Sequence, residues 1–102
     1  MASLAIRYLP PASDELEEAV NWYAARDPAT AEKFSRVFVA KLNEAAKAPH
    51  HWPLDRYGTR RIHLRPFSYY LVIREFRGAL EVVAVAHTSR RPGYWRKRLR
   101  DS

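Results

Sequence analysis

Residues 60–87 read RRIHLRPFSYYLVIREFRGALEVVAVAH, and they hold most of the sheet that the sequence predicts. Residues 69–76 are rich in Tyr, Val, Ile and Phe, a composition typical of strands. Residues 80–86 are almost wholly apolar, which predicts a central strand covered on both faces. Arg77-Gly78 between them predicts a tight turn, so the two segments should pair as a hairpin.

Residues 61–65 alternate between charged and apolar side chains, which is the pattern of a strand with one buried face. Ile62 and Leu64 should face the core, while Arg61, His63 and Arg65 share the opposite face. Three cations on one face favour binding of a partner. We therefore expect a sheet with one apolar face and one basic face.

Upstream of this region, residues 4–9 predict a first strand that Pro10-Pro11 stops. Ser13 is the expected N-cap of a first helix, with Asp14 and Glu15 in its first turn. An apolar stripe then follows at helical spacing, formed by Leu16, Ala19, Val20 and Tyr23.

A second helix should begin at Asp27-Pro28, with Asp27 as N-cap and Pro28 in the first helical position, and should end before Pro49. Its apolar stripe is formed by Phe34, Val37, Phe38, Leu42 and Ala45. The very short connection predicts an antiparallel helical hairpin.

The expected fold is α+β, in the order β-α-α-β-β-β, as a single domain over residues 1–102. The helical hairpin should pack on one face of an antiparallel sheet. A short basic tail should follow, with Pro92 at the start of a helix and with Tyr94 and Trp95 packing to pin the tail. Trp22 and Tyr23 are expected in the core.

The charge of the chain is unevenly distributed. The 102 residues carry a formal net charge of +7 and contain no cysteine, which excludes a disulfide framework and suits the cytoplasm. Residues 56–102 contain twelve lysines and arginines, eleven of them arginine, against three acidic residues. This half of the chain should attract a polyanion, namely RNA, DNA or an acidic protein. No segment is apolar enough to predict a membrane span.

Several segments, taken in order, resemble the RelE/ParE toxin superfamily. They are Ala-Val-Asn-Trp-Tyr at residues 19–23, Arg60-Arg61, Arg65-Pro66-Phe67, residues 69–73, and the ending at residues 83–95, where a histidine precedes Arg-Arg-Pro-Gly-Tyr-Trp. The ending is the most specific part, and the resemblance covers nearly the whole chain.

The resemblance implies a RelE-like fold and a toxin of a type II toxin–antitoxin (plasmid stabilisation) system. Such a toxin arrests growth and is neutralised by an acidic antitoxin, in a heterotetramer or a larger assembly. RelE-like members cleave messenger RNA on the ribosome, whereas ParE-like members poison DNA gyrase without being nucleases. A third alternative is an inactive, toxin-derived protein that only binds antitoxin.

For RNA cleavage, the residues matched to the family pattern are Arg65, Arg90 or Arg91, and Tyr94, with His87 or His63 able to move protons. The match is incomplete, because no glutamate stands beside these arginines in the sequence to act as a general base. The further candidates for binding nucleic acid or antitoxin are Arg60, Arg61, His63, Arg74, Arg91, Arg96, Lys97 and Arg98. Neither a metal nor another cofactor is expected.

Overall fold

The computed structural model describes residues 3–55 and 57–101. Its elements, in chain order, are β1 (Ala5–Tyr8), α1 (Pro10–Arg26), α2 (Pro28–Lys47), the 3-10 turn η1 (Pro49–His51), β2 (Arg60–His63), β3 (Tyr69–Phe76), β4 (Ala79–His87) and the 3-10 segment η2 (Arg96–Asp101). The predicted order of two helices and four strands is confirmed. Within the described ranges, neither long helix has the hydropathy that a bilayer span requires.

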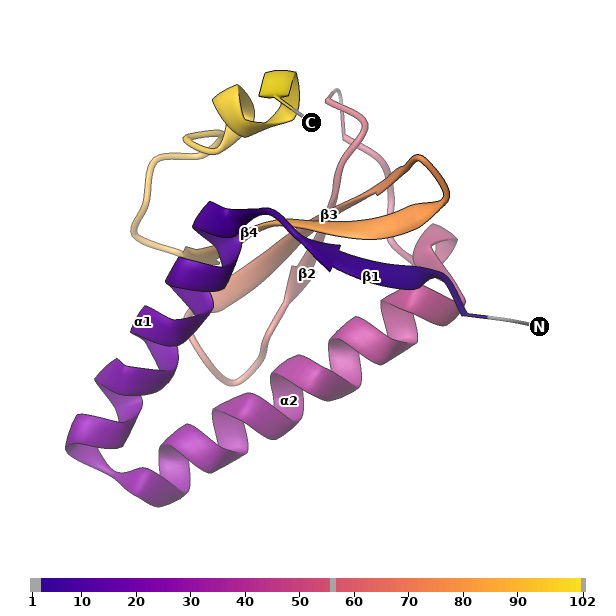
Figure 1. The fold of residues 1–102 in the computed structure, drawn as a ribbon. Coiled ribbons are helices and arrows are strands. Elements are labelled where there is room, and N and C mark those ends of the chain that lie inside the picture. Colours follow the sequence, from indigo (N-terminus) through magenta and orange to yellow (C-terminus); the bar gives the residue numbers. More distant parts are fainter. Residues whose placement is uncertain (1–2, 56, 102) are drawn as a thin grey trace.

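The four strands form one sheet in the order β1-β4-β3-β2 (Figure 1). β2, β3 and β4 are antiparallel neighbours, as predicted. β1, however, pairs in parallel with β4, so the prediction of a wholly antiparallel sheet is wrong. The reason is the connection: the two helices carry the chain from β1 over to β2, and such a crossover allows strands to run in the same direction.

The two helices begin differently. α1 starts at Pro10, with Leu9 as a cap that makes no side-chain hydrogen bond, so the predicted cap at Ser13 is wrong. A proline suits the first helical position because its φ is fixed and its missing N–H is not needed there. Glu15 consequently lies beyond the first turn. α2 starts as predicted, with the Asp27 carboxylate accepting hydrogen bonds from the Ala29 N–H and the Thr30 hydroxyl.

The helices and one face of the sheet enclose the larger core. α1 contributes Ala19, and Leu16, Val20 and Tyr23 pack around it, as the stripe predicted. The buried residues that α2 and the strands contribute are Phe34, Phe38, Leu42, Ala45, Ala46, Ile62, Leu71, Ile73, Leu80, Val82 and Val85. Asp27 alone connects the two helices. Figure 1 shows them diverging from this connection, with α2 running along this side of the sheet.

The opposite face of the sheet is covered by the C-terminal segment, which Figure 1 shows in yellow on the side away from α2. Trp95 is 2% exposed and packs in a second buried cluster with Tyr70, Val72, Val83, Ala84 and Ala86. The prediction of an open basic face is therefore wrong for the centre of the sheet, because β3 and β4 are apolar on both sides. The predicted packing role of Trp95 is confirmed, but the tail becomes helical only at Arg96, not at Pro92.

Candidate functional site

Glu15 connects α1 to the C-terminal tail. Its carboxylate accepts two hydrogen bonds from the Arg98 guanidinium, one to each oxygen and both 2.8 Å long. The Tyr94 hydroxyl donates to Oε2 at 2.7 Å, and the Val85 N–H donates to Oε1 at 3.0 Å. These four hydrogen bonds join a helix, a strand and the tail at a single carboxylate, which we call the Glu15 clamp.

The Glu15 clamp also completes the edge of β4. β1 pairs with β4 only as far as Val82, so the next backbone groups on that edge need other partners. Arg98 donates to the Val83 carbonyl at 3.0 Å, and Glu15 accepts from the Val85 N–H. Unsatisfied edge groups are costly when buried and attract other strands when exposed. The Glu15–Arg98 ion pair thus satisfies backbone groups of β4 that a longer β1 would otherwise have paired.

The electrostatics of the Glu15 clamp keep its members in fixed protonation states. Burial opposes ionisation of Glu15, but the hydrogen bonds from Arg98, Tyr94 and Val85 outweigh it and hold the pKa of Glu15 below its ordinary value. Burial, together with the hydrogen bond to Glu15, raises the pKa of Tyr94 well above that of a free tyrosine. Tyr94 is therefore a neutral hydrogen-bond donor.

A small cleft of about 120 Å³ brings together three of the four residues predicted for catalysis. Tyr94, His87 and Arg90 line it, with the Arg90 guanidinium 4.1 Å from the centre of the Tyr94 ring. Arg65 does not line this cleft and lies in the exposed turn after β2, not on the strand. Glu15 supplies the carboxylate that the sequence around the arginines lacks, because it comes from α1.

His87 is held by its neighbour Ser89. The Ser89 N–H donates to His87 Nδ1 at 3.0 Å, and the Ser89 hydroxyl lies 2.7 Å from the same nitrogen. Since Nδ1 accepts, the hydrogen of the neutral imidazole is on Nε2. The ring also meets Tyr69 edge-on at 5.0 Å between centroids.

The residues predicted for binding divide into an exposed group and a structural group. Arg61 and His63 lie together on the tail side of the sheet, with the Arg61 guanidinium 4.5 Å from the centre of the Tyr70 ring and His63 6.0 Å from it. Arg96 donates to the Tyr57 hydroxyl at 2.8 Å. The exposed group is Arg61, His63, Arg91, Arg96 and Lys97.

The structural group consists of Arg60, Arg74 and Arg98, whose guanidinium groups are engaged by the protein itself. Arg60 donates to the Trp52 carbonyl and lies 3.7 Å from Glu75, on the helix side of the sheet. Arg74 forms a 2.7 Å ion pair with Glu81, which is 1% exposed near the start of β4. The Arg7 guanidinium lies 3.5 Å from the other Glu81 oxygen. The role of this buried acid could not be predicted from a strand that is otherwise almost wholly apolar.

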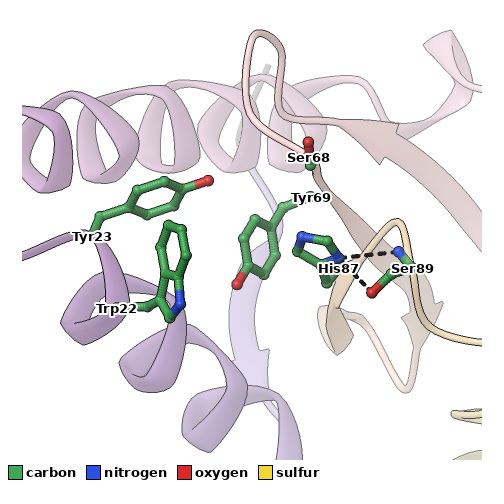
Figure 2. Close-up of a pocket in the computed structure, with 6 residues that line it drawn as sticks. All are labelled: Trp22, Tyr23, Ser68, Tyr69, His87 and Ser89. Carbon is green, nitrogen blue, oxygen red and sulfur yellow. Dashed lines mark hydrogen bonds between the residues drawn. The ribbon is translucent and has the colours of Figure 1, made fainter. Parts of the chain in front are cut away.

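An aromatic cavity lies between α1 and the ends of β3 and β4 (Figure 2). Trp22, which was expected in the core, is 50% exposed and forms one wall of it, while Tyr23 does pack against the core. The remaining lining residues are Ser68, Tyr69, His87 and Ser89.

The chain is similar to known toxins in both sequence and fold. A model of the ParE toxin of the type II toxin–antitoxin system parDE matches residues 6–92. The proteins named toxin ParE2 from two strains of Mycobacterium tuberculosis, CDC 1551/Oshkosh and H37Rv, are each 35% identical over 81 residues, covering 78% of this chain and 76% of theirs.

A solved chain of the chromosomal ParDE toxin–antitoxin system from P. aeruginosa has the same fold, with a TM-score of 0.71 at 13% identity, over 83% of this chain and 96% of that one. The superfamily resemblance includes both RelE and ParE toxins, whereas these sequence matches are to ParE toxins. The chain belongs to the ParE toxin family of type II toxin–antitoxin systems.

Proposed function

We propose that this protein arrests growth by binding DNA gyrase as a non-enzymatic inhibitor and that an acidic antitoxin neutralises it. The observation that carries this proposal is the Glu15 clamp. Tyr94, one of the residues matched to the catalytic pattern, donates its hydrogen to Glu15 and has a raised pKa, so it is a poor general base or acid near neutral pH. Arg98 is held by the same carboxylate. Messenger RNA cleavage therefore has less support than inhibition by binding.

The antitoxin should bind through the cations that the fold leaves exposed. Arg61 and His63 on the sheet and Arg91, Arg96 and Lys97 in the tail supply positive charge on the tail side. A disordered acidic segment gains both affinity and association rate on such a surface. A ParDE system contains toxin and antitoxin together, which supports a heteromeric assembly here as well. Gyrase and antitoxin would both be met in the cytoplasm.

The experiment that tests the target is a supercoiling assay with purified gyrase and relaxed plasmid. We expect added toxin to inhibit supercoiling, and toxin premixed with its antitoxin to leave supercoiling intact. A parallel translating extract should show messages of unaltered length. Unchanged supercoiling at excess toxin, or new message ends in the extract, would contradict the proposal.

The electrostatic part of the proposal needs its own measurement. We expect toxin–antitoxin affinity to fall as ionic strength rises, because exposed charges are screened over about 10 Å at 0.1 M salt. The double variant Arg61→Ala, Lys97→Ala should reduce that salt dependence. Affinity that does not vary with salt would contradict the proposed role of these cations.

Expression of the toxin alone tests the remaining alternative. Absence of growth arrest on expression would favour the inactive, antitoxin-binding protein.

A further inference from the structure

The aromatic cavity has a volume of about 370 Å³, within the range of small-molecule sites. Figure 2 shows Trp22 and Tyr23 on one side of it, and Tyr69 and His87 on the other. Its lining residues come from α1, from the ends of β3 and β4, and from the segments beside those strands. The antitoxin-binding cations proposed above do not line it.

The rings around the cavity hold one another in place. Trp22 meets Tyr23 edge-on at 5.1 Å, and Tyr23 in turn meets Tyr69 at 6.2 Å. The Arg26 guanidinium lies 3.6 Å from the centre of the Trp22 ring and donates to the Trp22 carbonyl, which fixes the position of the indole. Arg26 covers one face of the indole, and because Trp22 is half-exposed, the rest of its aromatic surface stays available for stacking.

The cavity offers hydrogen-bond donors from the His87 ring and from the Tyr23 and Tyr69 hydroxyls, which can also accept. The Ser89 N–H donates to His87 Nδ1, so the neutral His87 ring carries its hydrogen on Nε2, on the side of the ring away from Ser89 (Figure 2). Burial, Tyr23 and Glu18 raise the pKa of Tyr69, so its hydroxyl keeps its proton. Among the described residues, neither the Tyr69 nor the Tyr23 hydroxyl forms a hydrogen bond with the protein. A fitting ligand is a flat ring that carries hydrogen-bond acceptors.

Positive charge lies close to this cavity. Arg90 lines the adjoining cleft, which shares Tyr69 and His87 with the cavity. Arg65 is exposed three residues before Ser68 in the same connection. The opposing charges in the adjoining cleft are Glu18 and Glu15, and Glu15 is paired with Arg98. Cations beside a stacking surface are the arrangement by which proteins bind unpaired nucleic acid strands.

We propose that this cavity binds a base of an unpaired nucleic acid strand, with the base stacked on Trp22 and the flanking phosphates near Arg65 and Arg90. This contact goes beyond gyrase inhibition and does not depend on it. An aromatic side chain of a partner protein would also suit the rings, but it would leave the donors of His87 and Tyr69 without acceptors. The combination of donors and cations favours the base.

The test uses the full-length toxin without gyrase or antitoxin. Binding of a labelled single-stranded DNA oligonucleotide is measured beside binding of an abasic oligonucleotide of equal length, which has the same phosphates but no bases. We expect the base-bearing strand to bind more tightly, and Trp22→Ala to weaken its binding about tenfold. Trp22→Ala should leave the abasic strand unaffected, whereas Arg90→Ala should weaken both.

Matched variants separate stacking from damage to the fold. Trp22→Phe keeps a ring and should recover part of the affinity. Val39→Ala removes an apolar side chain that is 53% exposed on α2, and it should change nothing. Equal affinity for the two oligonucleotides, or an equal loss on both in Trp22→Ala, would overturn the proposal. It would also fail if Trp22→Ala weakened antitoxin binding and left oligonucleotide binding intact.

Discussion

Glu81 and Glu15 are two carboxylates neutralised by arginine, and they differ in what they connect. Glu81 lies inside β4, 1% exposed, between Arg74 of β3 and Arg7 of β1. Glu15 is on α1 and reaches the tail, where Arg98 and Tyr94 bind it. The Glu81 ion pairs join neighbouring strands of one sheet. The Glu15 clamp joins α1 to a strand and a tail that lie 70 or more residues away in the sequence.

This difference separates folding from function. Loss of the Glu81 ion pairs should disturb the sheet itself, because Glu81 and Arg74 are largely buried and the strands around them form the core. Loss of the Glu15 clamp should release the tail from a sheet that remains folded. The exposed cations Arg96 and Lys97 are in the tail, so the Glu15 clamp determines where part of the binding surface lies. Four predictions test this division, from the largest expected effect to the smallest.

Glu81→Ala should have the largest effect on stability. It leaves the guanidinium of Arg74, with 12% of its side chain exposed, without its carboxylate, and breaking a buried ion pair costs about 3 kcal/mol or more. Chemical denaturation would measure the loss of unfolding free energy. Glu32→Ala, which removes an exposed ion pair with Arg36, should cost less than about 0.5 kcal/mol. Equal losses in the two variants would show that Glu81 is not a buried ion-pair partner.

Glu15→Ala should cost about 2 kcal/mol, the scale of hydrogen bonds to a charged group, and should act locally. The Val85 amide loses its acceptor, so its hydrogen exchange should accelerate, while amides of the β2–β3 ladder stay protected. Glu17→Ala removes an exposed carboxylate from the same helix and serves as the control. Unchanged exchange at Val85 would mean that the Glu15 clamp does not hold the tail.

Tyr94→Phe should cost about 1 kcal/mol, because one hydrogen bond to Glu15 is lost and the ring remains. Growth arrest should persist, since the hydroxyl has no chemical role in the proposed function. The control is Tyr8→Phe, whose hydroxyl forms no hydrogen bond within the described part of the chain. A Tyr94→Phe variant that keeps full stability but loses toxicity would instead indicate a catalytic role for Tyr94.

The smallest effect concerns acid pH. The folded pKa of Glu15 lies below its unfolded value of about 4.3, so its contribution to stability is complete above that pH. The contribution is lost as the pH falls through the lower, folded pKa. Denaturation between pH 7 and pH 3 should therefore show a decline at the acid end that is shallower in Glu15→Gln. Asp55, whose pKa is also lowered, should contribute equally to the pH dependence of stability in both proteins. An identical decline of unfolding free energy in the two proteins would contradict the lowered pKa of Glu15 in the folded state.

Local patterns predicted the elements well because they act over a few residues. The limits of β3 and the start of α2 at Asp27-Pro28 are confirmed. So is the Arg77-Gly78 turn, where both residues have positive φ, at 51° and 77°, as a tight hairpin requires. In contrast, the pairing of β1 with β4 depends on contacts between residues more than seventy positions apart, and no periodicity reports it.

The candidate site was predictable only in part, for the same reason. Arg61 and His63 were placed on one face by alternation, and the strand confirms that placement. The partner of Tyr94 and Arg98 is 79 and 83 residues away, on a helix whose start was misplaced, so Glu15 was missed. The prediction that Trp22 lies in the core is wrong, because the helical pattern does not show how much of an aromatic side chain the surrounding elements cover.

The tail that covers the second face of the sheet has a consequence for the biogenesis of the protein. Synthesis proceeds from the N-terminus, so the β3–β4 hairpin is made before Trp95. Until then, Val72, Val83 and their neighbours lack their cover, and the nascent chain exposes an apolar surface. A chain interrupted ahead of Tyr94 would thus aggregate or be degraded rather than persist as a weakened toxin.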